Sequence, residues 1–140
     1  MTKHAEAFKS FGFWLLVLLF TINIVGGFVF NLFDVWYFDI VLHFLGGFGV
    51  YLFAKQFFKQ ALKNASWFDS ALLLTGATIF VGVFWEFGEY ALSIIWQTRP
   101  EGLTFIGDLM DTMNDLLMDM LGAVMAAVTT LLHFFRHRKS

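Results

Sequence analysis

Cysteine is absent from this 140-residue chain, and proline occurs only once. The absence of cysteine excludes disulfides, thiolate metal sites and cysteine nucleophiles, while the single proline leaves little room for linkers between domains. Charged residues make up only 14% of the chain, compared with about 25% in an average soluble domain, and 59% of the residues are hydrophobic. The composition therefore predicts one membrane-embedded domain over residues 1–140.

Four hydrophobic stretches are long enough to cross a membrane, at about 10–33, 36–58, 67–96 and 106–135. Backbone polar groups cannot stay unpaired in lipid, so each stretch must be a helix. The connections are short, which makes consecutive helices antiparallel neighbours. We predict an all-α polytopic membrane protein, an antiparallel bundle of four transmembrane helices. The first stretch is too long for a signal-peptide core and has no small-residue cleavage site before Asn31, so we expect it to be retained.

The basic residues predict how this bundle is oriented. Eight of the nine lysines and arginines lie near the two termini or between the second and third stretches, and only Arg99 lies on the other side. Cytoplasmic loops carry the excess of positive charge in membrane proteins, so both termini are predicted to be cytoplasmic. The expected location is the inner (cytoplasmic) membrane, crossed several times.

Ionisable residues occur inside three of the hydrophobic stretches, without any lysine or arginine at the same depth. They are Asp39, His43, Glu86, Glu89, Asp108, Asp111, Asp115 and Asp119. The four aspartates of the last stretch fall within a helical arc of about 80°, and the other pairs have spacings of three or four residues, so each set shares a helix face. A charge at a membrane-helix centre costs about 2.5–3.5 kcal/mol on insertion scales, so protonation, water or a bound cation must compensate.

A bound divalent metal is the most economical compensation for so many acids. The predicted ligands are His43, Glu86, Glu89, Asp111 and Asp115. Such oxygen-rich sets with one imidazole suit Mg²⁺, Mn²⁺, Ca²⁺, Zn²⁺ or iron, and the identity of the metal stays open. Supporting or proton-conducting roles are expected for Asp39, Asp108, Asn114 and Asp119. Alternatively, Asp39 and Asp108 are helix N-terminal acids favoured by the helix dipole, and His43 is a hydrogen-bond partner between helices.

Three motifs carry a family resemblance. They are Asp39-x-x-x-His43-Phe44, Trp85-Glu86-x-x-Glu89, and Gly107-Asp108-x-x-Asp111-Thr112-x-x-Asp115-x-x-x-Asp119-x-x-Gly122-Ala123. The chain resembles the uncharacterised YjdF-type family of bacterial and archaeal inner-membrane proteins and, more loosely, the VanZ-like family associated with teicoplanin resistance. It departs from the VanZ pattern by having Glu89 where glutamine is usual, and a more acidic last helix. The resemblance implies a shared polar site in the membrane and supplies no established reaction.

Together these features predict an integral membrane protein with a carboxylate/His metal site in the outer half of the bilayer. The predicted activity is that of a small metalloenzyme acting on a lipid or lipid-linked substrate, with Glu86 and Asp111 as candidate catalytic residues. The alternatives are a cation or proton transport element, and a structural or regulatory protein with a structural ion. Membrane lipid is the expected partner, nucleic acid is not, and a homo-oligomer is left open.

Overall fold

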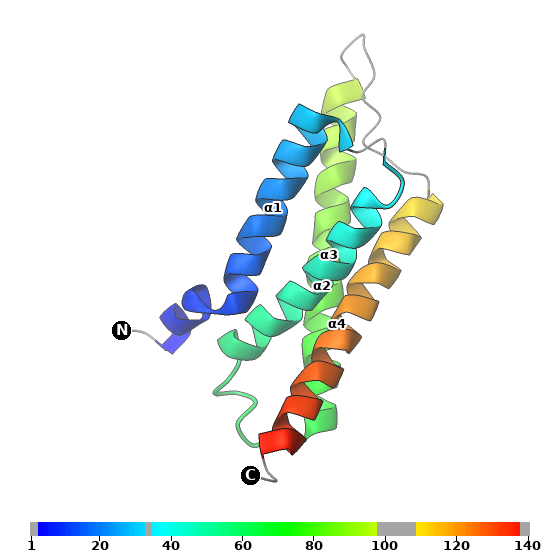
Figure 1. Ribbon diagram of the computed structural model, residues 1–140. Coiled ribbons are helices and arrows are strands. Elements are labelled where there is room, and N and C mark those ends of the chain that lie inside the picture. The colour runs from blue at the N-terminus through cyan, green and yellow to red at the C-terminus, as the bar shows by residue number, and fades with distance from the viewer. Residues whose placement is uncertain (1–2, 33–34, 98–108, 138–140) are drawn as a thin grey trace.

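The computed structural model of the protein describes residues 3–32, 35–97 and 109–137, which form four α-helices after a short 3₁₀ helix (Figure 1). The elements are η1 (Lys3–Lys9), α1 (Phe11–Phe30), α2 (Phe38–Phe57), α3 (Trp67–Gln97) and α4 (Leu109–His137). Consecutive helices run in opposite directions, so η1 and the end of α4 lie toward the same end of the bundle (Figure 1). The predicted all-α, antiparallel four-helix fold is confirmed, and the described ranges contain no strand.

Three helical segments are long and apolar enough to cross a membrane. They are Phe38–Phe57, Trp67–Leu92 and Leu109–Arg136, while α1 contributes a shorter apolar stretch, Phe11–Gly27. Large hydrophobic side chains such as Phe80, Phe84 and Phe87 are exposed along the outer surface of α3. A continuous apolar surface of this kind suits contact with lipid. The orientation of the bundle across the membrane stays a prediction.

Local sequence signals explain where two of the helices begin. The Ser10 hydroxyl accepts a hydrogen bond from the backbone N–H of Phe13, 3.3 Å away, and so caps the start of α1. At the start of α3, Ser66 accepts from the backbone N–H of Asp69 at 3.1 Å and donates its own hydroxyl to the Asp69 carboxylate at 2.7 Å. Helix α1 ends at Asn31, which adopts the left-handed conformation with φ 54°.

Helix α2 is the centre of the bundle, because it packs against each of the other three helices. Its closest partner is α4, which runs parallel to it and is not its neighbour in sequence. Glycines permit this approach: a Cβ atom added at Gly47 would collide with the backbone of Asp119, and one added at Gly122 would collide with the backbone of Phe44. The two glycines therefore fix how α4 is rotated against α2.

A core of small residues lies beyond these glycines, toward the end that holds η1 and the end of α4. Ala123 and Ala126 are fully buried, and they pack with Tyr51, Ala54 and Leu74. These side chains present no carboxylate to the space between α2, α3 and α4. Among the described residues, the buried ionisable side chains His43, Asp115 and Asp119 lie toward the opposite end.

Candidate metal centre

The polar site forms where the first turns of α2 and α4 meet the second half of α3. Helix α2 contributes Asp39 and His43, one turn apart, and α3 contributes Glu86 and Glu89. Helix α4 contributes its acidic face, on which Asp115 and Asp119 are buried, with 2% and 6% exposure. The predicted convergence of acids from three helices is therefore confirmed for the described residues.

His43 is the centre of this cluster and is only 6% exposed. Its Nε2 atom lies 3.7 Å from Oδ1 of Asp39 and 3.9 Å from Oε1 of Glu86. Its Nδ1 atom lies 3.5 Å from Oδ2 of Asp119. One imidazole is thus surrounded by carboxylates from α2, α3 and α4.

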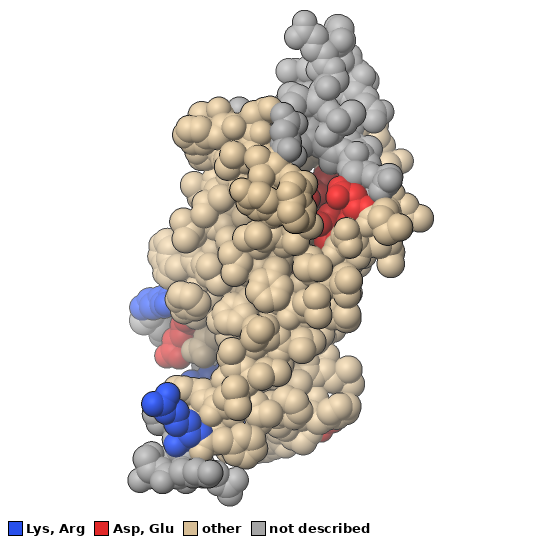
Figure 2. Space-filling view, turned by 45° about the vertical axis from the view of Figure 1, so that its right-hand side comes forward, with Lys and Arg blue, Asp and Glu red and all other residues tan. Residues whose placement is uncertain are grey.

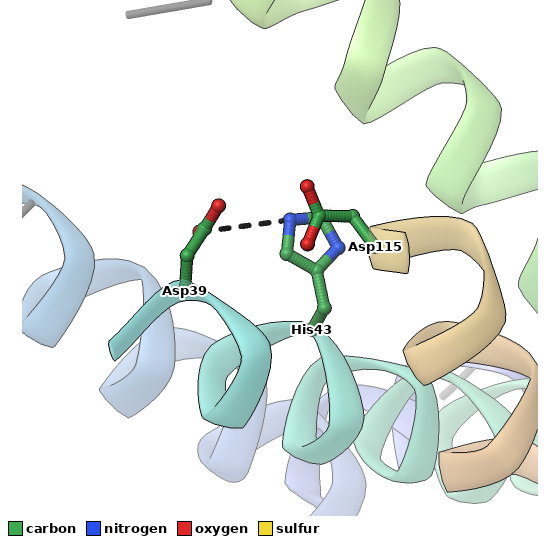
Figure 3. Close-up of side chains that lie close together, drawn as sticks. All are labelled: Asp39, His43 and Asp115. Atoms are coloured by element: carbon green, nitrogen blue, oxygen red, sulfur yellow. Dashed lines mark ion pairs between the residues drawn. The ribbon is translucent and has the colours of Figure 1, made fainter. Parts of the chain in front are cut away.

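Two groups of side chains are close enough to hold an ion. Asp39, His43 and Asp115 form one group, and His43, Glu86 and Glu89 form the other, with ligand atoms all within 4.8 Å of one another. Two ligands of one ion can lie at most twice the metal–ligand distance apart, or about 4–5 Å. Figure 3 shows Asp39 and His43 on successive turns of α2, with Asp115 reaching toward them from α4. Both groups share His43, so one ion bound there can draw on either set of acids.

Two carboxylate oxygens in the cluster are buried without a hydrogen bond. They are Oε1 of Glu86 and Oδ2 of Asp119, and neither has a hydrogen-bond partner among the described residues. Buried polar atoms are nearly always satisfied, and leaving one unsatisfied costs about 1–3 kcal/mol. A cation or a proton at this place would remove that cost.

The positions of the acids around the imidazole resemble those of metal-binding histidines. Such a histidine usually donates one ring N–H to a carboxylate, which fixes the tautomer and leaves the other nitrogen for the metal. Asp119 is placed to accept from Nδ1 of His43, while Nε2 faces Asp39 and Glu86. Gly82 of α3 leaves room for the Asp119 carboxylate, since a Cβ atom there would collide with it.

The remaining predicted residues lie further from the imidazole or outside the described ranges. Asp111 and Asn114 are exposed on α4, and neither belongs to the two candidate ligand groups. Asp108 lies outside the described residues. The ligand and catalytic assignments stay predictions, and the structure adds Asp39 to the residues that can reach an ion.

Sequence reasoning missed one polar contact that orients the site. The indole N–H of Trp85 donates a hydrogen bond to Oε1 of Glu89 across one helical turn, at 2.8 Å. The spacing of four residues was the available signal, because side chains four apart on a helix are neighbours. This bond restricts the rotamers of Glu89 and fixes where its second oxygen points.

Basic side chains are concentrated at the end of the molecule opposite the His43 cluster. Figure 2 shows a group of acidic side chains toward the end where α4 begins, while the visible basic side chains lie nearer the opposite end, together with further acidic side chains. Among the described residues, no lysine or arginine pairs with the carboxylates around His43, whose ion-pair distances are all to the imidazole. The cluster therefore retains a strong attraction for cations.

A pocket of about 270 Å³ lies beside His43, between α1, α2 and α3. Its polar lining residues include Asn23, Asp39, His43 and Asp119, and most of the others are aliphatic or aromatic. The sequence did not predict this pocket. The imidazole and two of its carboxylate neighbours are consequently within reach of a second molecule.

Comparison with known proteins identifies the family of the chain. A family model described as "Predicted membrane protein (DUF2238)" matches residues 2–137. This is the YjdF-type family, so the first of the two resemblances is confirmed, while the VanZ resemblance stays a prediction. No curated protein and no solved structure matches the chain.

Proposed function

The chain belongs to the DUF2238 family of predicted membrane proteins, and we propose that it is a small membrane metalloenzyme with one catalytic centre at His43. The observation that carries this proposal is that acids from three helices surround one buried imidazole. Two of these acids, Glu86 and Asp119, have a buried oxygen without a hydrogen bond. In the proposed centre Nε2 of His43 and Glu86 bind a divalent ion, and Asp119 orients the imidazole. The further ligands come from Glu89, Asp39 and Asp115.

A metal ion explains this cluster better than a set of protonated acids does. Protonation would neutralise each carboxylate separately, but it would leave several hydroxyl donors competing for few acceptors. One divalent ion neutralises two carboxylates at once, and each carboxylate coordinates the ion through an oxygen. Its oxygen-rich, single-imidazole ligand set favours Mg²⁺, Mn²⁺, Zn²⁺ or iron.

The pocket supports catalysis over a purely structural ion. Structural metal sites are closed by protein ligands, while catalytic sites keep a coordination position that water or substrate can occupy. Because His43 and Asp39 line the pocket, a molecule in the pocket can approach an ion bound at Nε2. An accessible ion would polarise a carbonyl or phosphoryl oxygen, or lower the pKa of a bound water, and a nearby carboxylate would accept the proton.

The packing beyond Asp119 argues against the transport alternative. A conducted ion would need polar groups along the whole bundle. Instead, the α2–α4 contact at Gly47 and Gly122 is closed backbone to backbone, and the buried Ala123 and Ala126 follow it. The acidic face therefore ends at a packed apolar core, as expected of a binding site with one opening.

Metal content of the detergent-purified protein tests the first half of this proposal. We expect a stoichiometric divalent metal by inductively coupled plasma mass spectrometry, and its loss in His43→Ala and Glu86→Gln. Glu6→Gln is the matched control, because Glu6 is exposed on η1, away from the cluster, and it should retain the metal. A folded wild type that binds no divalent ion after dialysis against each candidate would contradict the proposal.

Turnover tests the second half. The metal-loaded protein would be incubated with vesicles of phosphatidylglycerol and phosphatidylethanolamine, and products would be sought by mass spectrometry. We expect a product that requires the metal and disappears in Glu86→Gln. Bound metal without any product, together with a large loss of thermal stability in Glu86→Gln, would instead identify a structural ion.

A further inference from the structure

We infer that the pocket beside His43 binds one hydrocarbon chain of a membrane lipid, with the polar end of that lipid against His43 and Asp39. This inference names the substrate class of the proposed centre, and it rests on the proposed function for the statement that the bound lipid is a substrate. The inference that the pocket binds a hydrocarbon chain rests only on the shape and lining of the pocket.

The pocket is elongated along α2, with polar residues from Asp39 to the level of Gly46, where the Asp119 carboxylate lies, and an aliphatic end beyond them. Its α2 wall consists of Asp39, Leu42, His43, Gly46 and Val50, which follow one helix face over about 16 Å of helical rise. Both ionisable residues stand at the start of this wall, and the far end is aliphatic. On the antiparallel α1, Leu16 lies against Gly49 toward the apolar end, and Asn23 lies nearer the start of α2, where Phe38 meets Gly26. Polarity therefore changes in the same direction along both helices.

The apolar end offers hydrocarbon contacts and no open hydrogen-bonding group. Leu16, Leu19 and Val50 are aliphatic, and the hydroxyl of Thr78 already donates to the backbone oxygen of Leu74 at 2.9 Å. The volume of about 270 Å³ is near the lower end of ligand pockets, which run from about 300 to 1,000 Å³. This size suits part of a single chain rather than a whole two-chain lipid.

The polar end requires an oxygen-bearing group on the ligand. Asp39 and Asp119 line this end and repel an anion unless a cation lies between. A lipid hydroxyl suits this end by donating a hydrogen bond to a carboxylate, and an ester or phosphate oxygen suits it by binding the ion. A lipid places such a group directly at the end of its chain.

Access to the pocket comes from the side, where lipid would lie. Phe20 of α1 and Val81 of α3 line the pocket and are also 55% and 46% exposed at the surface. In the described part of the chain α1 packs on α2 and η1, and no close backbone approach joins it to α3. The rings of Phe20 and Trp85 meet edge to face at 6.2 Å across this opening. Movement of these two side chains would admit a hydrocarbon chain between α1 and α3 without separating any two packed helices.

Photocrosslinking with a chain-labelled probe tests the inference. The probes are palmitic acid bearing a diazirine in its chain, and phosphatidylglycerol carrying the same labelled chain, each in detergent-solubilised protein. Gly46→Leu and Val50→Phe fill the pocket. A Cβ atom at Gly46 meets only the Asp119 carboxylate, at 4.0 Å, so the larger side chain enters open space. Gly76→Leu is the matched control, because a Cβ atom there has nothing within 4 Å.

We expect labels on Leu16, Leu19 and Val81 in the wild type and in Gly76→Leu. Labelling of these residues should fall about tenfold in both pocket-filling variants, the loss that corresponds to about 1.4 kcal/mol of binding free energy. Labelling by the phosphatidylglycerol probe would assign the chain to a bilayer lipid, and labelling by palmitic acid alone would assign it to a single-chain lipid. Labels spread over the outer surface at Phe80 and Phe84, unchanged by either pocket variant, would overturn the inference.

Metal content of the same samples separates this inference from the proposed function. Val50→Phe lies at the apolar end, so it should lose the label and retain the metal. Pocket labelling in a wild type that binds no metal would refute the metal centre alone. Bound metal without pocket labelling would refute the lipid pocket alone.

Discussion

Among the described acids within ion-pair distance of His43, Asp119 has a distinct position. Asp39 and Glu86 face Nε2 of the imidazole, whereas Asp119 alone lies beside Nδ1, at 3.5 Å. A carboxylate in this place holds the ring in one tautomer and one orientation. Asp119 would therefore affect a bound ion by orienting the His43 ring.

Asp119→Asn should weaken metal binding about 10–100-fold, the usual effect of losing a carboxylate that supports a metal-binding histidine. Competition with a chromogenic chelator measures this change. Asn114→Ala on the exposed face of the same helix is the control and should bind the metal like the wild type. Equal affinities in wild type and Asp119→Asn would exclude the orienting role.

Helical spacing predicted which acids share a face, and it did so correctly for Asp39 with His43 and for Glu86 with Glu89. It could not rank the acids of α4, because all of them fall within one arc of about 80°. Contact with α2 makes the distinction, since it buries Asp115 and leaves Asp111 exposed. Which acids of α4 are buried depends on how this helix is rotated against α2, a segment distant in sequence. Residue spacing within one helix carries no information about that rotation.

At the scale of the elements, the α2–α4 contact determines the geometry of the site. Its two glycines bring the backbones together, and one of them, Gly47, touches the backbone of Asp119 itself. A methyl group at either position would push α4 away from His43. The site and the helix contact are therefore coupled.

Gly47→Ala and Gly122→Ala should each lower the free energy of unfolding by about 1–3 kcal/mol, the usual cost of overpacking. Thermal unfolding in detergent micelles measures this loss. Gly88→Ala is the matched control on α3, because a Cβ atom there meets nothing within 4 Å. It should be neutral or stabilise the protein by up to about 1 kcal/mol, since alanine favours the helix. Unfolding temperatures that do not distinguish the three variants would contradict this account.

The helix bounds were largely predictable, and the helix neighbours were less so. Hydropathy predicted α3 at 67–96, and the structure has Trp67–Gln97. Hydropathy reports only the transfer of each segment into lipid and carries no information about which helices are neighbours. It therefore says nothing about the parallel packing of α2 on α4, or about the pocket that remains beside α1.

At the scale of the whole molecule, the acids around His43 lie toward one end of the bundle, and the described lysines and the arginine lie toward the other. The positive-inside rule predicts that the basic end lies in the cytoplasm, and this orientation would put the His43 cluster in the outer half of the bilayer. Because the chain has no cysteine, single cysteines can report this orientation without any background.

Lys63→Cys, between α2 and α3, should react with a membrane-impermeant maleimide only after the membrane is permeabilised, so that the reagent reaches its inner face. Trp36→Cys, just before α2, should react in intact cells or spheroplasts, since residue 36 is 80% exposed in the wild type and lies at the other end of α2. The cysteine-free parent is the control for both. The reverse pattern would place the termini and the basic residues outside.

The closed α2–α4 contact has a consequence for the membrane as a whole. Since the acidic face ends at Gly47 and the buried alanines, the described residues offer no polar path along the α2–α4 contact by which the head group of a lipid bound beside His43 would reach the other monolayer. Substrate would be drawn from one leaflet, and the product would return to the same leaflet. Turnover would then change the composition of one side of the bilayer only, and this protein would contribute to lipid asymmetry without moving any lipid across.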